Sequence, residues 1–140
     1  MAQEIATRNG PTGREPRVLD ASVLAFDIPR ELERLRAEPA WTVERRNAVT
    51  LLKGSRLRVV LQVMQAGSRL QVPHADGPIT LLPLSGRIAL RAGELRQEAG
   101  PWCLLALQRR VAHEVEALEE SVVVLTIAFE GHDASGSESS

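Results

Sequence analysis

The sequence is poor in the residues that build disulfide, aromatic or thiolate sites. It contains one cysteine, two tryptophans, two phenylalanines and no tyrosine in 140 residues. A single cysteine excludes an intrachain disulfide and any zinc site built from several thiolates. The shortage of rings disfavours base stacking and sugar stacking, and no tyrosine is present to act as an acid or a base. Cys103, in the apolar stretch "WCLLAL", is expected to be a buried and inert thiol.

The sequence also lacks an excess of charge of one sign and a long apolar run. Its 17 Lys and Arg residues nearly balance its 18 Asp and Glu residues. Nucleic-acid binding requires a basic surface that neutralises phosphates, so none is expected. No apolar run reaches the ~18 residues that cross a bilayer, and the polar start "MAQEIATRNGPTGREP" has no apolar signal-peptide core. We therefore expect a cytoplasmic protein that binds neither nucleic acid nor membrane.

Polar segments at both ends of the sequence enclose one domain. Residues 1–17 mix glycine, proline and charged residues without periodicity, which predicts a flexible segment. Residues 131–140, "GHDASGSESS", predict a disordered tail. The residues between them, 18–130, are enough for a single domain with a buried core.

The stretch "DIPRELERLRAEP" predicts one short helix near 28–38. Asp27 is a good N-terminal cap, and Pro39 is expected to end the helix. One narrow apolar stripe runs along it, formed by Ile28, Leu32 and Leu35. A charged helix with a single apolar edge is expected to pack across the outside of another element.

The rest of the domain, about 42–130, predicts β-strands. Short apolar runs such as "LRVVLQVM", "ITLLPL" and "SVVVLTIAF" are separated by Gly and Pro, as in sandwiches and barrels. Pro83 is expected at a sheet edge or a bulge, because it has no N–H to donate. In "AHEVEAL" the two glutamates prefer water, so alternation turns His113 inward. By the same alternation His74 and Asp76 share one face of a strand.

The order of these features resembles a known family. A glycine and a histidine come early, followed by the hairpin "LSGRI", a Gly-Pro break, and "LLALQRRVAHEVEAL" running into "SVVVLTIAF". Over roughly residues 48–129 this resembles the small single-domain bacterial cupins. The resemblance implies an all-β, antiparallel jelly-roll barrel, with an N-terminal extension that carries the short α-helix.

The cupin metal motifs are only partly present. His74 resembles the first histidine of the first motif, and Asp76 stands where the second histidine would be. The glutamate of that motif falls near Ile79 or Thr80, neither of which is a carboxylate. His113 resembles the histidine of the second motif. The resemblance therefore implies a barrel that has lost about half of the usual metal ligands.

We expect a small-molecule-binding barrel without a tightly held catalytic metal, in a sensing or accessory role. Its ligand pocket is expected at His74, Gln62, Thr80, Trp102 and His113. Trp102 next to a Gly-Pro break is also typical of a packing residue.

Two alternatives stay open. The first is a metal-dependent cupin enzyme, an oxygenase or isomerase acting on a small organic acid. In it His74, Asp76 and His113 form a 2-His-1-carboxylate set around one divalent metal, Fe, Mn, Zn or Ni. Against it, an aspartate directly before Gly-Pro is a common turn former. The second alternative is a structural or protein-interaction module. A small open barrel exposes sheet edges, so a homodimer is expected, with residues 18–40 helping to cover an edge or a mouth.

Overall fold

The computed structural model describes residues 17–18, 22–72, 77–108 and 113–129. The helices in this part of the chain are α2 (Ile28–Ala37) and α3 (Pro39–Val43). The strands, in chain order, are β1 (Arg17–Val18), β2 (Arg46–Lys53), β3 (Leu57–Met64), β4 (Arg69–Val72), β5 (Ile79–Ser85), β6 (Ile88–Ala92), β7 (Leu95–Ala99), β8 (Leu105–Leu107), β9 (His113–Ala117) and β10 (Ser121–Ala128). Among the residues so described, no helix has the length and apolarity needed to cross a bilayer.

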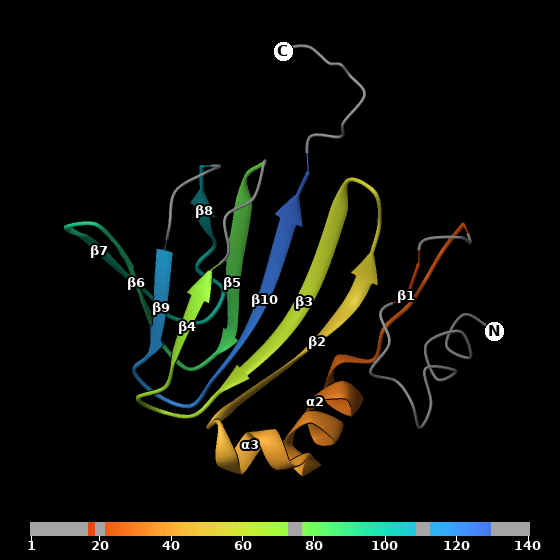
Figure 1. Ribbon diagram of the computed structural model, residues 1–140, viewed down its shortest axis with the longest axis horizontal. Coiled ribbons are helices and arrows are strands. Elements are labelled where there is room, and N and C mark those ends of the chain that lie inside the picture. The colour runs from red at the N-terminus through yellow and green to blue at the C-terminus, as the bar shows by residue number, and fades with distance from the viewer. Residues whose placement is uncertain (1–16, 19–21, 73–76, 109–112, 130–140) are drawn as a thin grey trace.

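The strands form two sheets that face each other (Figure 1). The larger sheet has the order β1-β2-β3-β10-β5-β8, and the smaller has the order β4-β9-β6-β7. β1 lies parallel to β2, and the other described pairings are antiparallel. From β3 onward the chain crosses between the sheets at almost every connection. This is the jelly-roll arrangement, so the predicted all-β fold is confirmed.

The space between the sheets is filled by apolar side chains from both. They come from β3, β5, β8 and β10 of the larger sheet and from all four strands of the smaller one. The buried members are Met64, Val72, Ile79, Leu81, Ile88, Leu90, Ala99, Leu107, Val115, Ala117, Val123, Leu125 and Ile127. We call this space the lumen, and much of it is packed like a core.

The larger sheet is buried on its outer face as well, because α2 packs across it. Leu35 of α2 is 0% exposed and packs with Val49, Leu61 and Val122 of the sheet. The cap is as expected, since Asp27 Oδ1 accepts a hydrogen bond of 3.1 Å from the Arg30 N–H. The helix predicted near 28–38 is therefore confirmed, together with its packing against the outside of the barrel.

The expectation of a single helix is wrong. Pro39 does end α2, but it also begins the five-residue helix α3. Proline suits the first turn of a helix because the N–H that it lacks would have no partner there. The predicted flexible segment 1–17 and tail 131–140 lie outside the described residues, except for Arg17, which begins β1.

The smaller sheet has one buried face and one face in water. Its outer face carries charged and polar side chains in register, such as Arg69 opposite Glu116 and Gln71 opposite Glu114. Gln71 Nε2 donates a hydrogen bond of 3.1 Å to Glu114 Oε2. An antiparallel sheet with one solvated face is expected to alternate in this way.

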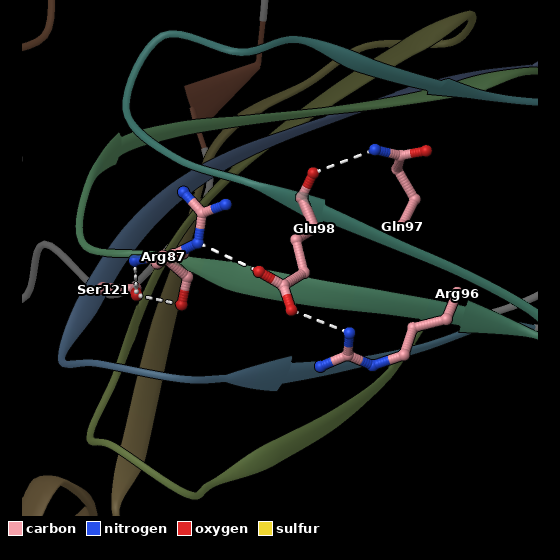
Figure 2. Close-up of polar contacts among 5 residues, drawn as sticks. All are labelled: Arg87, Arg96, Gln97, Glu98 and Ser121. Carbon is pink, nitrogen blue, oxygen red and sulfur yellow. Dashed lines mark hydrogen bonds and ion pairs between the residues drawn. The ribbon is translucent and has the colours of Figure 1, made fainter.

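The turn between β5 and β6 is locked to the turn between β9 and β10 (Figure 2). Gly86 has φ 83°, and a Cβ on it would collide with Ser121 Oγ and the Glu120 carbonyl oxygen. The fully buried Ser121 Oγ accepts from the Arg87 N–H at 3.0 Å and donates to the Glu119 carbonyl oxygen at 2.8 Å. A residue without a side chain is therefore required where these two turns meet.

Arg87 extends this joint to β7. Its Nε lies 3.1 Å from Glu98 Oε1, and Arg96 Nη1 lies 2.7 Å from Glu98 Oε2 (Figure 2). The hydrogen bonds from Arg96 and Arg87 hold the pKa of Glu98 below its ordinary value of 4.5.

Pro83 lies at a bulge, as predicted. Val122 of β10 pairs with Ser85, but the next residue, Val123, pairs with Pro83, so β5 has one extra residue there. The missing N–H of Pro83 therefore falls where the ladder is already interrupted.

Candidate functional site

His113 is a buried imidazole on the lumen side of β9. Its side chain is 6% exposed, and it shares its face with Val115 and Ala117 of the lumen core. Glu114 and Glu116 lie on the opposite face and are partly exposed. The two glutamates thus fix the facing of the strand, and the predicted inward orientation of His113 is confirmed.

His113 lies at the end of the barrel where two connections cross between the sheets. It pairs with Val72, the last residue of β4. At this end β4 and β8 finish and β5 and β9 begin (Figure 1). Gly77 and Pro78 lead into β5 against β10, where the Ala128 N–H donates to the Pro78 carbonyl oxygen at 3.0 Å. The imidazole therefore lies at one end of the lumen, among the ends of four strands.

The surroundings of His113 in the lumen are apolar. Leu107, Ile79 and Ile127 are in register across β8, β5 and β10 near this end, and all three are buried. Val72 adds a fourth buried apolar side chain from the smaller sheet. A neutral imidazole carries one hydrogen-bond donor and one acceptor. Among the described residues, His113 is thus a polar side chain beside buried apolar side chains at this end of the lumen.

Gln62 is another buried polar residue on the lumen side. It is 4% exposed and lies between Val60 and Met64 on the inner face of β3. Its Nε2 donates a hydrogen bond of 3.2 Å to the Asn47 carbonyl oxygen. Gln62 therefore faces inward, as the predicted pocket requires.

Thr80 is not placed with His113 and Gln62. Its neighbours on β5, Ile79 and Leu81, both belong to the lumen core, so Thr80 faces the other side of the sheet. In register it lies opposite Thr126 of β10.

Trp102 and Cys103 are both exposed, in the connection between β7 and β8. Trp102 is 71% exposed and has φ 68°, and its N–H donates to the Pro83 carbonyl oxygen at 2.8 Å. The exposed indole therefore neither lines the lumen nor packs in the core. The expectation that Cys103 is buried is wrong.

A separate cavity of about 300 Å³ opens beside the lumen, between α3, β2, β3 and β4. Its lining residues are Ala40, Glu44, Arg46, Asn47, Ala48, Gln62 and Leu70. We call it the β2–β4 cavity. Sequence reasoning selected Gln62 but missed Arg46 and Glu44, because nothing in the sequence shows that the smaller sheet leaves this part of β2 uncovered.

Comparison with known proteins identifies the fold. No family model and no curated protein matches the sequence. Solved structures do match, among them an RmlC-like cupin from Desulfovibrio desulfuricans, with a TM-score of 0.55 and 19% identity over 76% of this chain and 90% of the other. The protein has the cupin fold.

Two further solved structures are similar to this chain. A cupin superfamily protein from Desulfitobacterium hafniense DCB-2 matches with a TM-score of 0.57 and 13% identity, over 61% of this chain and 78% of the other. A protein from Bacillus halodurans matches with a TM-score of 0.60 and 19% identity, over 81% of this chain and 86% of the other. At these identities the likeness concerns the cupin fold and carries no activity with it.

The described part of this cupin-fold protein does not by itself contain a metal centre. No three His, Cys, Asp or Glu side chains come together among the described residues. His113 is the one member of the predicted 2-His-1-carboxylate set that falls within them, and His74 and Asp76 lie outside. One imidazole is too few for a metal centre, which takes at least three protein ligands. The three-residue set therefore stays a prediction.

Proposed function

We propose that this cupin barrel binds a small organic molecule at the His113 end of its lumen, in a sensing or accessory role and without a tightly held catalytic metal. One observation carries the proposal: a buried imidazole faces the lumen at the end where the strands stop. Apolar walls with a few placed polar groups are typical of small-molecule sites, and mouths of β-barrels are common places for them. We place the protein in the cytoplasm.

The side chains at the His113 end indicate the chemical class of the ligand. The described walls at this end are apolar, so the ligand presents mostly apolar surface, and one polar group hydrogen-bonds the imidazole. Small aliphatic and aromatic carboxylic acids and amides combine these properties. Burying the apolar part contributes about 25 cal/mol per Å², and the imidazole selects the orientation.

The test is a titration of the protein with a panel of such acids and amides, followed by NMR of the histidine imidazole signals. We expect one or more probes to shift the His113 signals and to bind at micromolar to millimolar concentration. His113→Gln is expected to weaken that binding. Glu116→Gln, on the same strand but on its solvated face, is the matched control and leaves it unchanged. A panel that shifts no His113 signal, or His113→Gln binding as tightly as the wild type, refutes the proposal.

A second candidate is a metal-dependent cupin enzyme. The observation that favours it is the inward facing of His113, the residue that matches the second cupin motif. The test is the metal content of untagged protein after incubation with Fe(II), Mn(II), Zn(II) and Ni(II). Near one metal per chain, lost in both His113→Ala and His74→Ala, favours the enzyme. Metal at background level in the wild type refutes it and leaves the metal-free binding barrel.

A further inference from the structure

The β2–β4 cavity exists because the larger sheet is wider than the smaller one. β4 is the edge of the smaller sheet, whereas the larger sheet continues past β3 to β2. The two faces of β2 are consequently buried to different extents. Val49, which faces α2, is buried, whereas Ala48, which faces the lumen side opposite Gln62, is exposed. The inner face of β2 is thus a wall without a facing sheet.

The cavity contains polar groups that the described protein does not use. Gln62 is 4% exposed, and its Nε2 is hydrogen-bonded to Asn47, but no described donor reaches its Oε1. Arg46 and Glu44 line the same cavity, and neither makes an ion pair with another described residue. An amide oxygen accepts hydrogen bonds, so Gln62 Oε1 is left available to a ligand that brings a donor.

Asn47 differs from these polar residues. It lines the cavity too, but its amide is fully engaged in the fold. Its Nδ2 donates to the Leu35 carbonyl oxygen at 3.0 Å and to Glu38 Oε1 at 2.8 Å, and its Oδ1 accepts from the Ala48 N–H at 2.9 Å. Asn47 therefore holds α2 and β2 together, and recognition is left to Gln62, Arg46 and Glu44.

Next to the cavity, hydrogen bonds join the turn between β3 and β4 to α3 and to the segment that leads from α3 into β2. Gln65, in the turn between β3 and β4, donates from Nε2 to the Trp41 carbonyl oxygen at 2.7 Å. Its N–H donates to the Arg45 carbonyl oxygen at 2.9 Å, and Arg45 Nη2 donates to the Ala66 carbonyl oxygen at 2.8 Å. Arg45 has φ 64°, a strained conformation for a residue with a side chain, and the last two of these bonds hold it in place. Preformed walls reduce the ordering cost of binding.

We propose that the β2–β4 cavity is a second ligand site, which takes a small amino carboxylate of amino-acid size. Arg46 binds the carboxylate, since its planar guanidinium donates two parallel hydrogen bonds to such a group. Gln62 Oε1 accepts a hydrogen bond from the amino group, and Glu44 attracts its positive charge. Ala40, Ala48 and Leu70 receive the apolar part. The volume of about 300 Å³ is at the small end of the range for ligand sites.

This site is distinct from the His113 end. His113 does not line the cavity, and Leu70, which does, precedes the partner of His113 by two residues along β4, roughly 7 Å. Ligand binding at the two sites is therefore tested by substitutions of different residues. Failure of one proposal leaves the other standing.

The experiment is isothermal titration calorimetry of the full chain with the common L-amino acids. The best binder is then compared with the same molecule lacking its amino group and with the same molecule lacking its carboxylate. We expect at least one amino acid to bind, and both truncated probes to bind more weakly. Arg46→Gln is expected to lower the affinity about tenfold or more, because a charge-assisted bidentate pair is lost.

Three further variants keep the proposal falsifiable. Ala48→Phe fills the cavity from an exposed position with Arg46 intact, and it is expected to abolish binding. Arg69→Gln, on the solvated face of β4, and His113→Gln are expected to bind like the wild type. The proposal is overturned if no amino acid binds at millimolar concentration, if Arg46→Gln and Ala48→Phe both bind like the wild type, or if His113→Gln removes the binding. Equal binding of the probe without an amino group overturns the roles of Glu44 and Gln62.

Discussion

The contact between the β5–β6 and β9–β10 turns allows a sharp test of the fold. An alanine at Gly86 has a conformational cost and a steric cost, whereas an alanine at Gly93 has only the conformational cost. Gly86 and Gly93 both have positive φ, 83° and 61°. Alanine in this region of backbone space costs about 1–2 kcal/mol at either position. At Gly93 the methyl group meets nothing within 4 Å, so this is the whole expected cost of Gly93→Ala.

Gly86→Ala carries a second cost. Its methyl group collides with Ser121 Oγ and with the Glu120 backbone, and backbone cannot rotate away as a side-chain tip can. Overpacking of this kind typically adds about 1–3 kcal/mol. We therefore expect Gly86→Ala to lose about 2–5 kcal/mol of the free energy of unfolding, clearly more than Gly93→Ala loses.

The assay is urea unfolding followed by circular dichroism, with the slope compared between variants so that only the midpoint carries the difference. Gly67→Ala is a second control, since Gly67 has φ 88° and also meets nothing within 4 Å. Equal losses in all three variants, within about 0.5 kcal/mol, would refute the reasoning, because the conformational cost alone would then explain them.

Other predictions follow from the same contacts. Glu98→Gln removes a carboxylate whose pKa is lowered in the folded state by Arg96 and Arg87. The ionised Glu98 therefore stabilises the wild-type fold above pH 4.5, and this contribution is lost as the pH falls. The difference in Tm between wild type and Glu98→Gln should shrink on acidification, and a constant difference contradicts this. Leu35→Ala should lose about 2–5 kcal/mol in chemical unfolding, because its fully buried side chain fills the contact between α2 and the larger sheet; a loss below about 1 kcal/mol would show that the helix is dispensable. Trp102→Ser should shift sedimentation from dimer to monomer if the expected homodimer buries this exposed indole, and an unchanged dimer excludes Trp102 from the interface.

The alternation of inward and outward side chains along a strand gave the most accurate sequence predictions. His113 was predictable because two glutamates flank it and prefer water, which fixes the face of β9. The same rule applied to β5 excludes Thr80 from the lumen, since Ile79 and Leu81 face inward. Thr80 entered the predicted pocket through its place in a motif instead, and motif position does not determine facing.

Strands with little apolar character escaped prediction. β4, "RLQV", and β7, "LRQEA", are edge strands of the smaller sheet and carry polar residues toward water. Their strand conformation comes from pairing. β4 pairs with β9, which is far away in the sequence, and β7 pairs with β6, from which a tight turn separates it. A local pattern does not contain that information.

Exposure also depends on features that composition does not reveal. The apolar residues of "WCLLAL" predicted burial, but Trp102, Cys103 and Leu104 lie exposed in the connection between β7 and β8. The β2–β4 cavity depends on one sheet being wider than the other, which is a property of topology. Arg46 and Glu44 are ordinary surface residues in the sequence and become cavity residues only in the folded chain.

The place of β10 in the larger sheet has a consequence for how the chain is made. β10 pairs along its length with β3 on one side and β5 on the other, although Ser121 follows its partner Met64 by 57 residues. While the chain is being synthesised, β3 and β5 therefore wait for a strand that emerges after all the others. Contacts so distant in sequence form slowly. A chain that stops before residue 121 leaves two apolar strand edges open in the middle of its larger sheet, and such edges pair with other chains. We therefore expect prematurely terminated chains of this protein to aggregate, even when His113 itself is present.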